Sequence, residues 1–246
     1  MRPLSAAELL SVWERSMDLS LLRKTLLLLD LACPEMDEGE ITLFSIGERD
    51  ARLFKIREWM FGSRFRNTID CPQCGRAMEW EMNTEDFNLA VIPDKWAPEE
   101  YELNVNDFTI RFRLPNSQDI SEILLPGTSN QESDHLLQNC ILEIKQKNRK
   151  YSQKTLPEKV SKALASKIEE LDPAADIRIG ISCPDCSHKW EAPFDIMSYL
   201  WSEINNWAQR MLQDIYLLAK TFGWAERDIL NMDATRRQLY VEMIRS

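Results

Sequence analysis

Four cysteines, arranged as two widely separated pairs, are the residues of this sequence best suited to chemistry. The first pair is Cys71 and Cys74 in CPQC, and the second is Cys183 and Cys186 in CPDC. Two residues between a pair of thiolates allow both sulfurs to bind one tetrahedral Zn²⁺. A single pair supplies only half of the four ligands of a closed structural site. The sequence therefore predicts one structural zinc ion held by all four cysteines.

The residues around the two pairs predict the elements that position them. Each pair is followed by a strand with a Trp-Glu dipeptide, at Trp80-Glu81 and at Trp190-Glu191. Each Trp lies an even number of residues beyond its second cysteine, so in an extended strand it points to the same side as that cysteine. We therefore expect two β-hairpins that form a split zinc ribbon, with one Trp beside the metal in each hairpin.

Other kinds of cysteine site are less consistent with this pattern. A thioredoxin-type CxxC lies at the N-terminus of a helix, whereas both pairs here lead into strands. A catalytic zinc site needs an open position and His or carboxylate ligands. His188 could replace a cysteine as a ligand, but we interpret it as an exposed strand residue. His135 falls in a helical stretch and is interpreted as a packing or surface residue.

Few residues suited to catalysis remain outside the cysteine pairs. The chain has 2 His and 7 Gly, and it contains no Walker loop, GxGxxG or GxSxG motif. Cys33 and Cys140 are interpreted as buried thiols. The sequence predicts a protein that is not an enzyme and takes no small-molecule substrate. A thiol enzyme, with a low thiol pKa at Cys71 or Cys183, stays an alternative.

The charge balance argues against nucleic acid as the main partner. The 246 residues carry a formal net charge of −10, and an acidic chain is repelled by phosphate backbones and anionic lipid. Arginines and one lysine from Arg49 to Arg66 form a local basic stretch with acidic residues among them. We interpret this stretch as a solvated helix face with ion pairs.

Nothing in the sequence predicts a membrane segment. The aliphatic run Leu26–Leu29 is far shorter than the roughly 20 residues that a membrane-spanning helix needs. Glu8 lies where a secretory signal would be apolar. We expect a protein of the reducing cytoplasm, where disulfides are disfavoured.

Periodicity and turn residues predict an α+β fold that is mainly helical. Ser5 and Glu8 form a capping box before a first helix, and a long amphipathic helix ends at Gly223. Residues 101–115 read as a hairpin, residues 117–124 and 133–147 as helices, and residues 175–182 as a strand. The expected parts are an N-terminal helical part (1–66), a first zinc knuckle (67–90), an inserted α+β subdomain (91–180), a second knuckle (181–193) and C-terminal helices (194–246), in one compact unit.

Several motifs share their order and spacing with a known family. They are Ile-Gly-Glu-Arg-Asp-Ala at 46–51, both CPxC knuckles, Phe194-Asp195, Trp201, the Phe222-Gly223-Trp224 corner, Ile229-Leu230, and Arg236-Arg237 with Tyr240. In these motifs the chain resembles the T-even-type bacteriophage baseplate protein family, which occurs in contractile phage tails and in tail-derived contractile injection systems. The resemblance covers about half of the chain, and residues 91–180 carry no part of it.

The resemblance implies a non-enzymatic structural or assembly protein of a baseplate or its hub, in the cytoplasm or incorporated into a phage-tail-like particle. Its partners would be other baseplate, hub or tail proteins. Aromatic and arginine residues near the C-terminus suit such a contact: Trp224, Arg227, Arg236, Arg237 and Tyr240. An assembly chaperone that leaves the particle, and a zinc-ribbon adaptor in transcription or RNA handling, stay alternatives.

Overall fold

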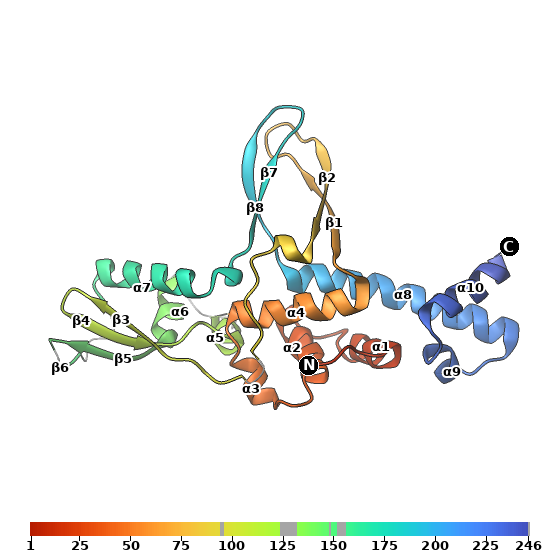
Figure 1. Ribbon diagram of the computed structural model, residues 1–246, viewed down its shortest axis with the longest axis horizontal. Coiled ribbons are helices and arrows are strands. Elements are labelled where there is room, and N and C mark those ends of the chain that lie inside the picture. Colours follow the sequence, from red (N-terminus) through yellow and green to blue (C-terminus); the bar gives the residue numbers. More distant parts are fainter. Residues whose placement is uncertain (94–95, 124–131, 148, 152–155, 246) are drawn as a thin grey trace. The chain divides into compact units, whose positions relative to one another are not determined.

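The fold is α+β and mostly helical, with two cysteine-bearing hairpins and long C-terminal helices, as the sequence predicted. The computed structural model describes residues 1–93, 96–123, 132–147, 149–151 and 156–245 (Figure 1). It divides into two compact units, Met1–Glu35 with Asp195–Ser246, and Met36–Phe194. The five consecutive parts expected from the sequence stay a prediction. No helix in the described part of the chain is long and apolar enough to cross a membrane.

The first unit is helical and joins the two ends of the described chain. Its helices are α1 (Ala6–Arg15), α2 (Leu21–Ala32), α8 (Ile196–Phe222), α9 (Glu226–Leu230) and α10 (Ala234–Arg245). The predicted capping box of Ser5 and Glu8 begins α1. The predicted end of α8 is also confirmed, because Gly223 has the left-handed φ of 72° that favours glycine.

The spacing of apolar residues in α8 explains the core of this unit. Its apolar residues recur every three or four positions, so one face of the helix is buried against α1, α9 and α10. The buried members of this core are Leu10, Ala208, Met211, Ile215, Leu218, Ile229 and Val241. The indole of Trp201 donates a hydrogen bond of 3.1 Å to the buried hydroxyl of Thr25, which satisfies a polar group inside the apolar contact.

In the described part of the chain, the second unit combines short helices with three small sheets. Its helices are α3 (Glu38–Thr42), α4 (Ile46–Phe61), η1 (Thr84–Asp86), α5 (Ser117–Ile123), α6 (Glu132–Cys140), α7 (Glu158–Leu171) and η2 (Pro173–Ala175). Its strands are β1 (Arg64–Asp70), β2 (Ala77–Asn83), β3 (Tyr101–Val105), β4 (Phe108–Phe112), β5 (Ile141–Gln146), β6 (Arg149–Lys150), β7 (Arg178–Ser182) and β8 (Lys189–Pro193). β1 pairs only with β2 and β7 only with β8, each antiparallel, whereas β3 to β6 form one sheet.

The four-stranded sheet corrects one prediction. The hairpin around Asn106 and Asp107 is confirmed, with Asn106 at a φ of 53°. The helix expected over 133–147 is wrong beyond Cys140, because Ile141–Gln146 forms β5 and pairs with the free edge of β4. This edge offers backbone partners along β5, and Ile141 and Ile144 pack against the core beneath the sheet. Tertiary pairing therefore overrides an ambiguous local pattern.

The arginines of α4 correct a second prediction. Arg49, Arg52 and Arg57 are 3%, 2% and 2% exposed, so the interpretation as a solvated face is wrong for them. The guanidinium groups of Arg52 and Arg57 lie over the rings of Phe44 and Phe65, each 3.9 Å from the ring centre. Their long side chains are buried because aromatic faces and backbone carbonyls replace water.

An aromatic cluster joins the bases of the two cysteine hairpins. It consists of Phe54 of α4, Phe65 of β1, Phe87 after η1 and Phe194 after β8, with ring centres 4.7–5.9 Å apart. Figure 1 shows both hairpins leaving the second unit side by side. The cluster packs the ends of the hairpins that lie away from the cysteines.

Candidate metal centre

Each cysteine pair lies in a tight turn between two strands, and the first turn follows from its residue types. The Cys71 N–H donates to the carbonyl of Arg76 at 2.9 Å, and the Gly75 N–H donates back to the carbonyl of Cys71 at 2.9 Å. Gly75 has a φ of 72°, a conformation that costs least for glycine. The turn holds Cys71 and Cys74 at the end of the β1–β2 hairpin.

The second turn repeats the geometry without a glycine. The Cys183 N–H donates to the carbonyl of His188 at 2.8 Å, and the Ser187 N–H donates to the carbonyl of Cys183 at 3.0 Å. Ser187 occupies the position of Gly75 and has a φ of 59°. Serine adopts this conformation less readily than glycine, so the second turn carries a strain that the first avoids.

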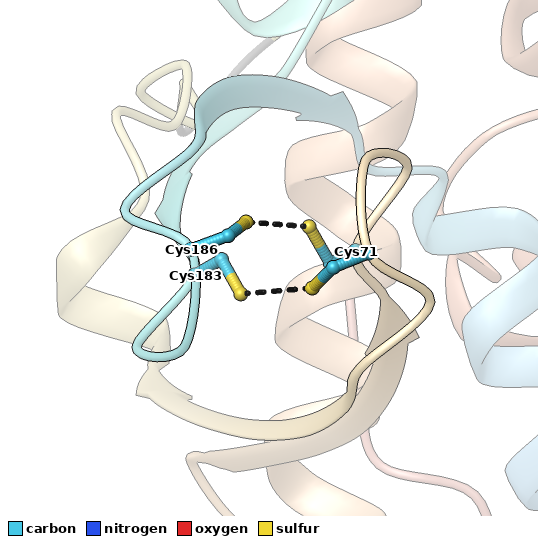
Figure 2. A group of neighbouring side chains, drawn as sticks. Cys71, Cys183 and Cys186 are labelled. Carbon is cyan, nitrogen blue, oxygen red and sulfur yellow. Dashed lines mark hydrogen bonds between the residues drawn. The ribbon is translucent and has the colours of Figure 1, made fainter.

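The two turns face each other, so that the sulfurs of one approach those of the other (Figure 2). The Sγ atoms of Cys71 and Cys186 are 3.7 Å apart, and those of Cys74 and Cys183 are 3.6 Å apart. All four Sγ atoms lie within 4.8 Å of one another. The structure thus brings together the four cysteines that the sequence singled out.

These distances fit one tetrahedral ion. Four sulfurs at about 2.3 Å from a common centre are about 3.8 Å from one another. A disulfide would require a separation of about 2.05 Å, and none of the four cysteines forms one. The arrangement is therefore suited to binding a metal ion rather than to storing a disulfide.

The thiols differ in how readily each ionises without a metal. Burial opposes ionisation of Cys71, but the backbone N–H groups of Cys74 and Gln73 and the neighbouring thiols lower its pKa to about 7. At Cys186 a hydrogen bond from the His188 backbone favours the thiolate, yet desolvation and the nearby sulfurs outweigh it and raise the pKa to about 12. Four clustered sulfurs resist a build-up of negative charge, which a divalent cation would neutralise.

The side chains around the two hairpins make contacts that the sequence did not predict. Arg76 and Asp185 form an ion pair of 3.6 Å from one turn to the other. His188 is half-buried in the second turn and stacks on Trp190 at 5.6 Å, so its prediction as an exposed strand residue is wrong. Trp80 is half-buried and packs edge-on against Phe194 at 6.0 Å.

The residues predicted to bind a partner separate into two groups. Trp224 and Tyr240 lie 5.0 Å apart and pack against the core of the first unit, and Arg237 is only 8% exposed. Arg227, with 85% of its side chain exposed, and Arg236 lie on the surface. The aromatic residues thus contribute to folding, whereas Arg227 and Arg236 are exposed, and a role of these residues in partner binding stays a prediction.

A family of known proteins matches a large part of this chain. The model of the T4 bacteriophage base plate protein family matches residues 28–201. This range covers well over half of the chain and contains both cysteine hairpins. The chain belongs to the T4 bacteriophage base plate protein family. No match was found among curated proteins or among solved structures.

The matched range of this baseplate-family chain differs from the residues that carried the resemblance. It includes residues 91–180, where the sequence offered no shared motif, and it ends at Trp201. The Phe222-Gly223-Trp224 corner and Arg236-Arg237 therefore lie outside it. Both cysteine hairpins and residues 91–180 lie inside the matched range.

Proposed function

We propose that this chain is a non-enzymatic structural or assembly protein of a contractile tail-like particle, acting in the baseplate or its hub through contacts with other tail proteins. The family match over residues 28–201 is the observation that carries this proposal. The four-cysteine cluster supports it, because four protein ligands leave no open position for a substrate. In this proposal the folded chain provides surfaces that contact other tail proteins. The metal-bound cysteines would hold the two hairpins in a fixed position.

The metal in this proposal is zinc. A tetrahedral site made only of thiolate sulfurs suits Zn²⁺ or an iron–sulfur centre, and two CxxC knuckles at the ends of hairpins are typical of structural zinc. Cys71, Cys74, Cys183 and Cys186 would hold the ion. It would join two hairpins that are separated by residues 75–182 of the sequence.

A partner contact at the C-terminal helices is the second part of the proposal. Arg227 and Arg236 are exposed and arginine is enriched where proteins bind one another. The variant Arg227→Glu/Arg236→Glu should leave folding intact and weaken incorporation into particles. Arg23→Glu, an exposed arginine of α2 in the same unit, is the matched control and should incorporate normally. If the wild type, the double variant and Arg23→Glu were incorporated equally, Arg227 and Arg236 would be excluded as a partner-binding surface.

A native mass spectrum of the chain, purified from cells that also express its neighbouring genes, tests the proposal as a whole. One zinc per chain together with the mass of a tail or hub protein is the expected result. A chain that binds partners during assembly but is missing from finished particles would be an assembly factor. Binding to RNA with a steep salt dependence, and to no tail protein, would instead favour the adaptor in transcription or RNA handling.

A further inference from the structure

The N-terminus of α4 is held by two segments of the second unit that lie far from it in the sequence. The first amide groups of a helix have no partner within it. In α4 the N–H of Ile46 donates to the carbonyl of Pro115 at 3.1 Å. The N–H of Gly47 donates to Oδ2 of Asp172 at 3.0 Å. The segments that follow β4 and α7 are therefore both attached to the start of this helix.

The contact between Gly47 and Asp172 leaves no room for a side chain. A Cβ added to Gly47 would lie 1.8 Å from Oδ1 of Asp172 and 3.1 Å from the Cβ of Ala174. Asp172 and Ala174 are 5% and 1% exposed. Position 47 thus needs a glycine for close packing, since the backbone amide itself contacts the carboxylate.

The charge of Asp172 suits this position. A carboxylate is stabilised at a helix N-terminus by the helix dipole and by the free amides. Burial raises the pKa of Asp172, whereas the Gly47 amide, the Ser45 hydroxyl and the positive charge of Arg49 favour its ionised form. On folding, these interactions replace the contacts of the carboxylate with water. Because hydrogen bonds are directional, they fix the position of the chain at Asp172.

One route from this contact leads to the first cysteine pair. It runs along α4 to Arg57, whose Nη1 donates to the carbonyl of Gly62 and whose Nη2 donates to that of Arg64, each at 2.6 Å. These bonds fix the turn between α4 and β1. Strand β1 then leads directly to Cys71.

A second route leads from the same contact to the second cysteine pair. Asp172 immediately precedes η2, which packs against α4. The chain then reaches Ile177, just before β7, whose carbonyl accepts a hydrogen bond of 2.8 Å from the amide of Phe194, just after β8. Strand β7 leads directly to Cys183. Both half-sites are therefore reached through short, ordered segments from one point.

We propose that the Gly47–Asp172 contact positions the two cysteine hairpins so that both pairs bind one metal ion. This inference rests on the proposed zinc site. Two half-sites on one chain bind an ion cooperatively to the extent that the chain presents them at the correct separation. The aromatic cluster holds the bases of the hairpins by apolar packing, which is not directional. The Gly47–Asp172 contact supplies the directed bond that fixes where β7 starts.

The test compares zinc affinities of the full chain by competition with a chromophoric chelator under reducing conditions. Gly47→Ala and Asp172→Ala should each bind zinc about tenfold more weakly than the wild type, at the lower end of the effect of losing a group that orients metal ligands. Asp172→Asn keeps an oxygen for the Gly47 amide and should show a smaller loss. If the alanine variants do not fold, the zinc affinity of Asp172→Asn tests the proposal.

Asp119→Ala is the matched control. Asp119 is a buried aspartate of the same unit, 2% exposed, whose carboxylate accepts hydrogen bonds from Arg113 and from the Asn116 amide. Its loss should lower the melting temperature and leave zinc affinity unchanged.

The outcomes separate the two proposals. Wild-type zinc affinity in folded Gly47→Ala and Asp172 variants would overturn the positioning role while leaving the zinc site intact. An equal loss in Asp119→Ala would also overturn it, because the effect would then be general destabilisation. A wild-type chain that binds no zinc would instead refute the metal site itself.

Discussion

Removing the metal should open the ends of the two cysteine hairpins while the rest of the second unit stays folded. The perturbation is either chelation under reducing conditions or Cys183→Ser, which removes one of the four sulfurs. Cys183 is 2% exposed, and no strand of one hairpin pairs with a strand of the other. Little besides the metal would therefore hold the two turns together.

The size of the effect follows from the contacts between the hairpins. Structural zinc contributes about 10–16 kcal/mol of binding free energy in zinc-finger peptides. Across the turns the structure otherwise has the exposed Arg76–Asp185 pair, and such pairs contribute about 0–1 kcal/mol. A two-stranded hairpin is marginal by itself. Without metal the free energy of opening should therefore fall to about 1 kcal/mol or less.

Hydrogen exchange of backbone amides measures this opening directly. Amides of β2 and β7 should exchange at least roughly a hundredfold faster after metal removal, since each 1.4 kcal/mol changes the open population tenfold. Amides of β4 should keep their protection, because the core beneath the four-stranded sheet contains no metal ligand. Cys140→Ser is the matched control, as Cys140 is buried but lies outside the cluster; it should keep its zinc and its protected hairpins.

Two results would refute this reasoning. Unchanged protection of β2 and β7 in metal-free protein would mean that the aromatic cluster and backbone bonds hold the hairpins without help. Loss of protection throughout β4 would mean that the metal stabilises the whole second unit, and that the opening is not local.

Four further substitutions test individual residues. Gly75→Ala should destabilise the zinc-bound protein by about 1–2 kcal/mol and Ser187→Gly should stabilise it slightly, because both positions have a left-handed φ; shifts of the urea midpoint measure both. Arg57→Lys should cost about 2–3 kcal/mol, since lysine cannot donate to two carbonyls in the fixed fork of arginine. The Arg2 side chain and the Ser5 backbone lower the pKa of Glu8 to about 2, below its unfolded value near 4.5. This contribution is therefore complete above pH 4.5 and is lost as the pH falls towards 2, and Glu8→Gln should flatten the pH dependence of unfolding in that window.

The four-cysteine cluster was predictable because each of its parts is encoded locally. A CPxC turn needs only its own six residues to form, and the alternation after each pair indicates a strand. The long helix α8 was predictable for a similar reason, since its stripe of apolar residues and Gly223 specify both its face and its end. We inferred that the two turns meet because a closed site needs four ligands and each pair supplies only two. The distances between the Sγ atoms confirm that the turns meet.

The buried arginines of α4 were not predictable from local pattern. Arg52 and Arg57 alternate with acidic residues as an exposed ion-paired helix would, and their partners are aromatic rings and carbonyls supplied by the surrounding structure. The strand at Ile141–Gln146 was missed for a related reason, because only the free edge of β4 decides between helix and strand there. Gly47 did carry a signal, as a glycine inside the first turn of a helix needs a packing reason.

The position of the cysteines at the far end of the hairpins, away from the aromatic cluster, has a physical reason. Four phenylalanines can bury their rings against one another only where α4 and the bases of both hairpins converge. Beyond that point each strand has an exposed face, as the alternating burial of β2 and β7 shows, and two narrow hairpins cannot enclose a core. A metal ion needs only four sulfurs and no buried volume. A metal at the turns can therefore keep two exposed hairpins together as one element, and this suits a protein whose proposed role is to contact other proteins.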